Sequence, residues 1–299
     1  MGANVIEIVG GTGPIEAAED ITPRQRRLWH VILRNRLAVA GGVIVLLWII
    51  AAIAAPILTR YDPVTWQDSY HTLAPPSAAH LLGTDDNGRD VLSRLLYGGR
   101  ASLGIGVTVV LSGVIVGLLL GGVAGFVGHA VDEVIMRFAD IVLSFPILIL
   151  ALSVSAALGP SLLNAALAMV VVWWPTYARV VRGLVLEIKE REFVTAARAV
   201  GVSEWRILWQ TVLPNTVGSV VILATLDVGN AILTVAGLSF IGFGVPPPNP
   251  EWGSMISAAQ RYPDQWWLAV FPGIAIFTAI IGFNFFGDAV RDALDPRTR

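Results

Sequence analysis

Long apolar runs separated by short polar segments dominate the pattern of this 299-residue chain. A helix that crosses the hydrocarbon core of a bilayer needs about 20 mostly apolar residues. Six windows meet or approach that length: 37–58, 101–127, 139–158, 162–181, 216–243 and 268–288. The pattern therefore predicts an all-α, polytopic membrane protein with six transmembrane helices.

Composition supports a membrane protein and removes several kinds of chemistry. Charged residues make up 14% of the chain, whereas a soluble domain carries about 25%. The absence of cysteine excludes disulfides, thiolate metal sites and cysteine nucleophiles. The four histidines are scattered without ligand spacing, so the sequence predicts no metal site and no cofactor bound by this chain.

The distribution of basic residues predicts the orientation of the spans. If the N-terminus is cytoplasmic, only five of the 20 positive residues lie outside, namely Arg60, Arg89, Arg94, Arg100 and Arg261. The positive-inside rule then favours an N-in, C-in topology. The small residues at 52–56 resemble a signal-peptidase site, but about 36 residues precede the apolar run, which favours an uncleaved first span.

Three segments follow from this topology. Residues 1–23 have little periodicity and are expected to form a mobile cytosolic tail. Residues 24–100 hold the first span and an external segment, and residues 101–299 hold five spans and a cytoplasmic loop. That loop, residues 192–214, is called the coupling loop below.

The coupling loop has the pattern of two short amphipathic helices. Apolar residues recur at helical spacing on both sides of Gly201, which suits the left-handed backbone that ends a helix. Ser203 is a candidate N-cap for the second helix, and Pro214 is expected to end it and open the next span. The apolar positions are Phe193, Ala196, Ala197 and Val200, then Trp205, Leu208, Trp209 and Val212. By itself this pattern also fits a helix pair lying in the membrane interface.

The order of residues in this loop resembles the EAA loop of permease subunits in ATP-binding-cassette importers. The segments 81–103, 231–256 and 271–297 extend the resemblance to the second permease subunits of dipeptide/oligopeptide/nickel importers, over about residues 25–298. Thr195 stands where the family motif has Glu. The resemblance implies that the residues that couple to an ATPase are Thr195, Ala196, Ala197, Gly201, Trp205, Leu213 and Pro214.

The same resemblance implies the partners and the fold. They are a second permease subunit in a heterodimer, two ATP-binding subunits or domains that use ATP and Mg²⁺, and an extracytoplasmic solute-binding protein. The fold would be that of a type I importer permease in the lipid of a bacterial plasma (inner) membrane, with no nucleic-acid partner. The chain has no Gly-Lys-Ser/Thr phosphate loop of its own, so it is expected not to be an enzyme.

Two groups of residues inside the spans carry competing interpretations. Four glycines recur every fourth residue in the second window, which favours close helix packing over a moving interface: Gly113, Gly117, Gly121 and Gly125. Asp227 lies at mid-depth in the fifth window, three residues before Asn230. A carboxylate there is costly unless it faces protein or water, so it either lines a translocation pathway or forms a buried hydrogen bond, for which Asn284 is the candidate partner.

The sequence therefore predicts a permease subunit that imports di- or oligopeptides, with glutathione or nickel chelates as alternative substrates. A self-contained secondary transporter is the alternative from a different class. That class would show several coupled ionisable residues or an internal repeat, and neither is present in this sequence.

Overall fold

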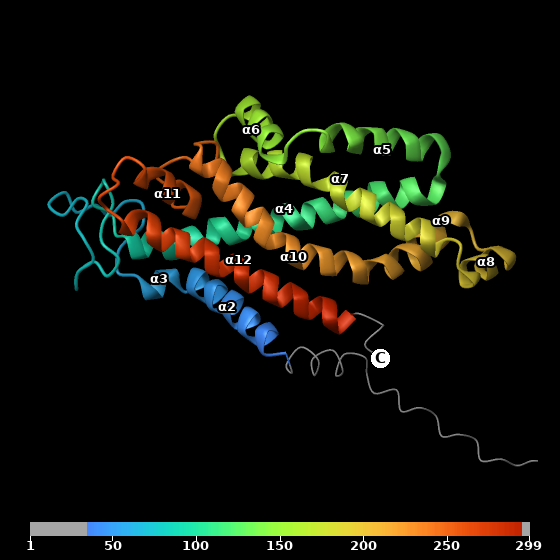
Figure 1. Cartoon of the computed structure of the whole chain (residues 1–299), viewed down its shortest axis with the longest axis horizontal. Coiled ribbons are helices and arrows are strands. Elements are labelled where there is room, and N and C mark those ends of the chain that lie inside the picture. The colour runs from blue at the N-terminus through green and yellow to red at the C-terminus, as the bar shows by residue number, and fades with distance from the viewer. Residues whose placement is uncertain (1–34, 295–299) are drawn as a thin grey trace, which may run out of the picture.

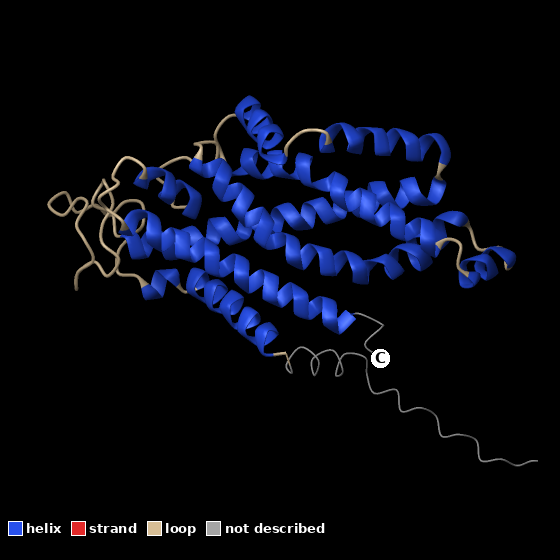
Figure 2. Cartoon of the chain, viewed as in Figure 1, coloured by secondary structure: helices blue, strands red, loops and turns tan. Residues whose placement is uncertain are grey.

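Five helices are long and apolar enough to cross a bilayer within residues 35–294, the part of the chain that this computed structural model describes. No β-strand occurs in that part, and the prediction of an all-helical membrane protein is confirmed (Figure 2). The predicted tail at 1–23 lies outside the described residues. The five helices are α2 (Arg36–Ile53), α4 (Val91–Val127), α7 (Leu162–Ile188), α10 (Leu213–Phe240) and α12 (Trp267–Leu294).

The third predicted span is not one continuous helix. Instead, α5 (His129–Leu143) and α6 (Ile147–Leu158) meet at an angle of 94°, either as a broken span or as a re-entrant pair. Pro146 lies in the break, lacks an amide hydrogen and disfavours the helical conformation of Phe145. The expectation of a single helix over 139–158 was therefore wrong, and the sixth span exists only if the bent pair is counted as one.

Short helices lie at the two ends of the long ones. At one end are α8 (Glu192–Ala199) and α9 (Glu204–Ile207), which a π-helical turn (Leu208–Val212) joins to α10. At the opposite end lie α3 (Ala55–Leu58), α11 (Trp252–Ala259) and the irregular 59–90 segment (Figure 1). The long helices therefore connect two structurally different ends.

Helix α4 begins at Val91, ten residues before the predicted window. Its N-cap is Asp90, whose side chain accepts a hydrogen bond from the Ser93 amide at 2.8 Å. At 1.5 Å per residue, its 37 residues span about 55 Å, well beyond a hydrocarbon core of about 30 Å. The division predicted between residues 100 and 101 thus falls inside this helix.

The packing of α4 on α7 follows the predicted glycine stripe. All four stripe glycines are buried, and a Cβ atom added at any of them would press on α7. Tyr177 lies against Gly113 and Gly117, Ala178 lies against Gly121, and the side chain of Val185 lies against Gly125. Small residues allow this close backbone approach where lipid provides no hydrophobic drive between helices.

A second glycine contact, which the sequence analysis did not single out, joins α2 to α12. A Cβ atom at Gly41 would lie 2.6 Å from Cβ of Phe285, and one at Gly282 would lie 3.0 Å from Ile44. Trp48 adds a hydrogen bond of 3.0 Å to Thr278. The first span is thereby attached to the last.

Candidate coupling surface and translocation site

Helix α8 is attached to the rest of the molecule through one side. Val194 is fully buried in the core cluster and Ala197 packs against that cluster. The opposite side is open, with Phe193 47% exposed and Val200 80% exposed. The apolar residues that the sequence pattern grouped on one face therefore include two large ones that the fold leaves uncovered, while the anchor is Val194.

The turn after α8 is a Schellman motif centred on Gly201. Its φ is +83°, in the left-handed region that glycine adopts without steric cost. The Val202 amide donates to the Ala197 carbonyl at 3.1 Å, and the Gly201 amide donates to the Arg198 carbonyl at 3.0 Å. These two bonds fix the angle at which the chain leaves α8.

The second half of the coupling loop does not end at Pro214. Ser203 occupies the N-cap position of α9, although its side chain makes no capping bond. The chain then continues through the π-helical turn into α10 without a break. Pro214 lies in the first turn of α10, where its missing amide hydrogen is tolerated. The expected stop at Pro214 was therefore wrong, because helical backbone continues from α9 through the π-helical turn, although Pro214 does lie at the start of the next span as expected.

The coupling loop presents apolar and charged groups together. Ile207, Leu208 and Val212 are buried, while Trp205 is 57% and Trp209 is 45% exposed. Arg198 pairs with Glu204 at 3.1 Å across the turn and lies 5.9 Å from the ring centre of Phe126. A hollow of about 320 Å³ lies between the end of α4 and α9, lined by Phe126, Val127, Glu204 and Trp205.

The remaining predicted coupling residues occupy two environments. Thr195 and Ala196 are exposed on α8, as is Pro214 at the start of α10. Leu213 is buried, and its side chain lies against Gly122 of α4. The loop is thus exposed on one side and packed on the other.

Inside the bundle, Asp227 is partnered by a residue that the sequence analysis missed. Its carboxylate accepts a hydrogen bond from the Tyr177 hydroxyl at 2.9 Å and lies 3.4 Å from the Asn230 amide nitrogen. Asn284 is not its partner, because its side-chain oxygen instead faces Gly229 of α10. Tyr177 could not be found from spacing, since it lies on α7, 50 residues away.

Two ion pairs hold α5 beside α7. Arg182 contacts Asp132 with two hydrogen bonds of 2.5 and 2.6 Å, and Arg179 pairs with Asp140 at 2.6 Å. Asp132 and Asp140 are eight residues apart and therefore lie on one side of α5. Helix α5, which precedes the break at Pro146, is thus held against α7 by ion pairs as well as by packing.

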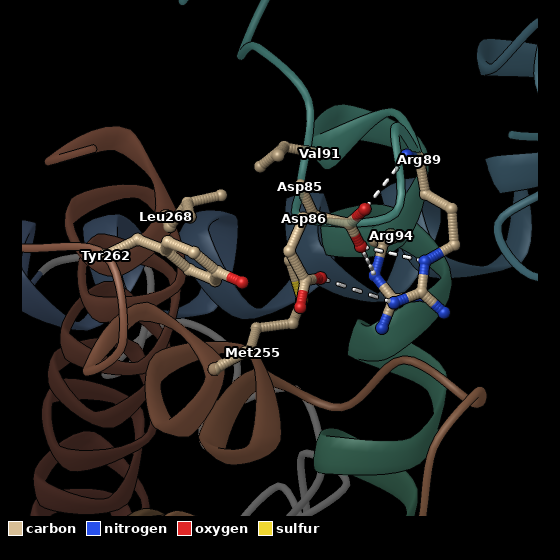
Figure 3. Close-up of a pocket in the computed structure, with 9 residues that line it drawn as sticks. Asp85, Asp86, Arg89, Val91, Arg94, Met255, Tyr262 and Leu268 are labelled. Atoms are coloured by element: carbon tan, nitrogen blue, oxygen red, sulfur yellow. Dashed lines mark hydrogen bonds and ion pairs between the residues drawn. The ribbon is translucent and has the colours of Figure 1, made fainter. Parts of the chain in front are cut away.

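At the opposite end of the molecule, a buried charge cluster joins three segments. Arg94 of α4 lies 3.3 Å from Asp85 and donates hydrogen bonds to the carbonyls of Pro63 and Pro248. Arg89 pairs with the same carboxylate at 2.8 Å. Figure 3 shows both arginines turned toward Asp85 and Asp86, beside a cavity of about 30 Å³. That volume suits a water molecule.

Glu251 completes the contact between this end and α4. It is fully buried, accepts hydrogen bonds from the amides of Gly253 and Ser254, and caps α11. The Ser102 hydroxyl of α4 donates a further bond of 3.1 Å. Burial raises the pKa of Glu251 above the usual carboxyl range, while these hydrogen bonds oppose the rise.

Within residues 35–294, no group of three or more histidine, cysteine or acidic side chains is arranged to hold a metal ion. The polar clusters described above instead connect helices and loops of this chain.

Comparison with known proteins defines the class of this molecule. Residues 113–299 match the binding-protein-dependent transport system inner membrane component, and residues 23–76 match the N-terminal transmembrane domain of oligopeptide transport permease C. The chain belongs to the family of binding-protein-dependent transport system inner membrane components. It is a multi-pass protein of the bacterial inner membrane, and the resemblance identified from its motifs is confirmed.

Curated relatives match over nearly their whole length. The dipeptide transport system permease protein DppC of Escherichia coli (strain K12) is 44% identical over 293 residues, which cover 95% of this chain and 97% of the relative. DppC of Alkalihalophilus pseudofirmus is 41% identical, with 92% and 90% covered. The glutathione transport system permease protein GsiD of Pectobacterium atrosepticum is 39% identical, with 96% of both chains covered.

The fold is also that of a solved transporter. A chain of the inward-facing MetNI methionine ABC transporter superposes with a TM-score of 0.56 at 19% identity, covering 67% of this chain and 96% of that chain. At this identity the match supports the type I importer permease fold alone. Family membership implies a permease subunit that works with ATP-binding subunits and a solute-binding protein, and that is not itself an enzyme.

Proposed function

We propose that this chain is the second permease subunit of an ATP-driven importer of di- or oligopeptides. Relatives named for dipeptide transport match it at 41–44% identity over nine-tenths or more of their length. The glutathione permease relative, at 39% identity, supports glutathione as the second candidate substrate. A solute-binding protein would deliver the substrate and carry most of the selectivity.

The main support for this mechanism is that the coupling loop is buried on one side and exposed on the other. It is anchored through Val194 and Ile207, yet leaves Trp205 and Val200 uncovered. Large apolar residues exposed at the tip of a bundle indicate a protein-docking surface. We assign this surface to an ATP-hydrolysing subunit, which binds ATP and Mg²⁺ and pushes the loop as a rigid body.

The coupling loop is continuous with α10, so a movement of the loop can be transmitted to this span. Because no break separates α9 from α10, a displacement of the loop would tilt the span that carries Asp227. We propose that Asp227 and Asn230 line the pathway, with Asn284 nearby on α12, and that the partner across the pathway is a second, different permease. The N-terminus and the coupling loop are assigned to the cytoplasm by the positive-inside rule.

Replacing Gly201 tests the coupling role. Valine at φ +83° is strained by about 1–2 kcal/mol and would change the angle between α8 and α9. We expect Gly201→Val to insert normally but to uncouple ATP hydrolysis from peptide uptake, measured together in proteoliposomes containing all subunits. Gly201→Asn, which tolerates the left-handed conformation, should retain coupling.

Gly183→Val is the matched control, because Gly183 is exposed on α7 and a Cβ atom there meets nothing within 4 Å. Normal coupled uptake by Gly201→Val would contradict the docking assignment. Uptake without ATP by the purified chain alone would favour a secondary transporter instead.

A further inference from the structure

A hollow of about 310 Å³ opens beside the first turn of α4. That end of α4 lies at the end of the molecule opposite the coupling loop (Figure 1). One wall comes from Leu58 at the end of α3 and from the residues that follow it, including Arg60. The other comes from Leu81 and from Asp90, Leu92 and Ser93 at the start of α4. The wall therefore combines apolar side chains with a cation and a hydroxyl.

The polar groups of this hollow are incompletely used by the protein. Ser93 is 1% exposed, and its hydroxyl has no hydrogen-bond partner among residues 35–294, which is unusual for a buried polar atom. Arg60 is exposed and forms no ion pair with any acidic side chain in residues 35–294. One hydroxyl donor and one positive charge thus line the same hollow, and neither has a side-chain partner in the described part of the chain.

Asp90, the one acidic residue of the lining, is already engaged. One carboxylate oxygen lies 2.9 Å from Nδ1 of His80, and the other accepts the Ser93 amide. The side chain is also 5% exposed. Both carboxylate oxygens are therefore occupied and the side chain is almost inaccessible, whereas Arg60 is exposed, so Arg60 is the charge in this lining that an incoming ligand meets.

The depth of the hollow in the membrane follows from the adjoining helices. The last residues of α2 and α3 expose large apolar side chains, with Ile53 69%, Ile57 88% and Leu58 56% exposed. Such surfaces face hydrocarbon in a spanning segment. Arg60 follows two residues after this apolar surface ends, so the hollow lies where the headgroups of that leaflet begin.

We propose that this hollow binds the phosphodiester headgroup of a membrane phospholipid. Arg60 pairs with the phosphate, and the Ser93 hydroxyl donates a hydrogen bond to it. The amino-terminal end of α4 adds a favourable dipole. Leu58 and Leu81 contact the glycerol and the first part of the acyl chains. The bound lipid would hold the first span against the 59–90 segment, and this role is independent of what the protein transports.

Lipid binding by the purified full-length chain, with any subunits that co-purify, tests the proposal. After delipidation by detergent exchange, phosphatidylglycerol, diacylglycerol and inorganic phosphate are titrated separately, and bound molecules are counted by native mass spectrometry. We expect one phosphatidylglycerol site that diacylglycerol does not fill. Arg60→Gln should weaken it about tenfold, the value of one charge-assisted hydrogen bond.

Two further variants keep the test decisive. Ser93→Ala should weaken binding several-fold, and Leu81→Glu should abolish it by placing a negative charge at an exposed position of the rim. Arg261→Gln, an exposed arginine on the same end of the molecule, should bind as the unmodified protein does. Equal phosphatidylglycerol affinity in Arg60→Gln, equal binding of diacylglycerol, or binding of inorganic phosphate without the lipid would each overturn the proposal.

Discussion

Asp227 illustrates how one residue inside a span can combine packing and chemistry. Its carboxylate is satisfied by the Tyr177 hydroxyl, and Tyr177 occupies the space that Gly113 and Gly117 leave free on α4. Three helices therefore cooperate to hold one acidic group at mid-depth. A merely structural carboxylate needs only this donor, whereas a carboxylate on the pathway also needs its charge.

The change Asp227→Asn separates these two roles. Asparagine keeps an oxygen that can accept the Tyr177 bond, so we expect the folded protein to be retained. Peptide uptake per folded transporter should fall about tenfold, as expected for the loss of about 1.4 kcal/mol of charge interaction. Uptake into proteoliposomes across a range of pH is the measurement.

Tyr177→Phe is the control for the hydrogen bond alone. It should lower the free energy of unfolding by about 1–3 kcal/mol, because the Asp227 carboxylate loses the hydroxyl that donates a hydrogen bond to it. Full uptake by Asp227→Asn at every pH would restrict Asp227 to a structural role.

At the scale of elements, glycine decides how closely the helices approach. The α4–α7 contact is formed by four glycines in register, and a Cβ atom at Gly121 would collide with the backbone of Ala178. Backbone cannot rotate away as a flexible side chain can. The ion pairs from Arg179 and Arg182 to α5 then add a third helix to the same pair.

Gly121→Leu should therefore separate α4 from α7. We expect the free energy of unfolding to fall by more than about 3 kcal/mol, the upper end of the usual cost of overpacking a core. The yield of monodisperse protein should also be poor. Thermal unfolding and size-exclusion chromatography in mild detergent are the measurements. Gly104→Leu is the matched control on α4, because a Cβ atom at Gly104 meets nothing within 4 Å. Similar behaviour of both variants would show that the stripe does not determine this packing.

Across the whole molecule, the two ends are built differently. The coupling loop presents exposed aromatic residues on a short, anchored element. At the opposite end, Arg94 joins α4 to the 59–90 segment and to the loop before α11. Trp252 bonds α11 to α4, and Trp267 bonds α12 to the 59–90 segment. One end is open for docking, and the other is connected internally by buried polar bonds.

Arg94→Met should loosen the connected end. The change removes a buried cation, unpairs two carbonyls and weakens the pairing of Asp85, for which a cost of about 3–5 kcal/mol is typical. We expect a lower unfolding temperature and faster proteolysis within the 59–90 segment. Arg261→Met, at an exposed position in the same part of the molecule, should change neither. Unchanged protease resistance in Arg94→Met would show that the cluster is not what holds this end together.

Some features of the site were accessible to sequence reasoning because they depend on local chemistry. The turn at Gly201 follows from glycine's tolerance of positive φ, and the stripe in α4 follows from a spacing of four residues. The route through Pro214 was misjudged, because proline is compatible with a first helical turn and the π-helical turn gives no clear sequence signal. The break at Pro146 was missed because apolar residues on both sides hide it in a hydropathy window.

The sequence by itself determined that the chain is helical, that it crosses a membrane and which family it belongs to. These properties rest on composition, periodicity and contiguous motifs, and all three can be read along the chain. Only the tertiary structure decided that Tyr177 partners Asp227, that Arg94 joins three segments and that Trp267 bonds the 59–90 segment. Such contacts join residues far apart in sequence, and the geometry of helix packing, which no local pattern encodes, brings them together.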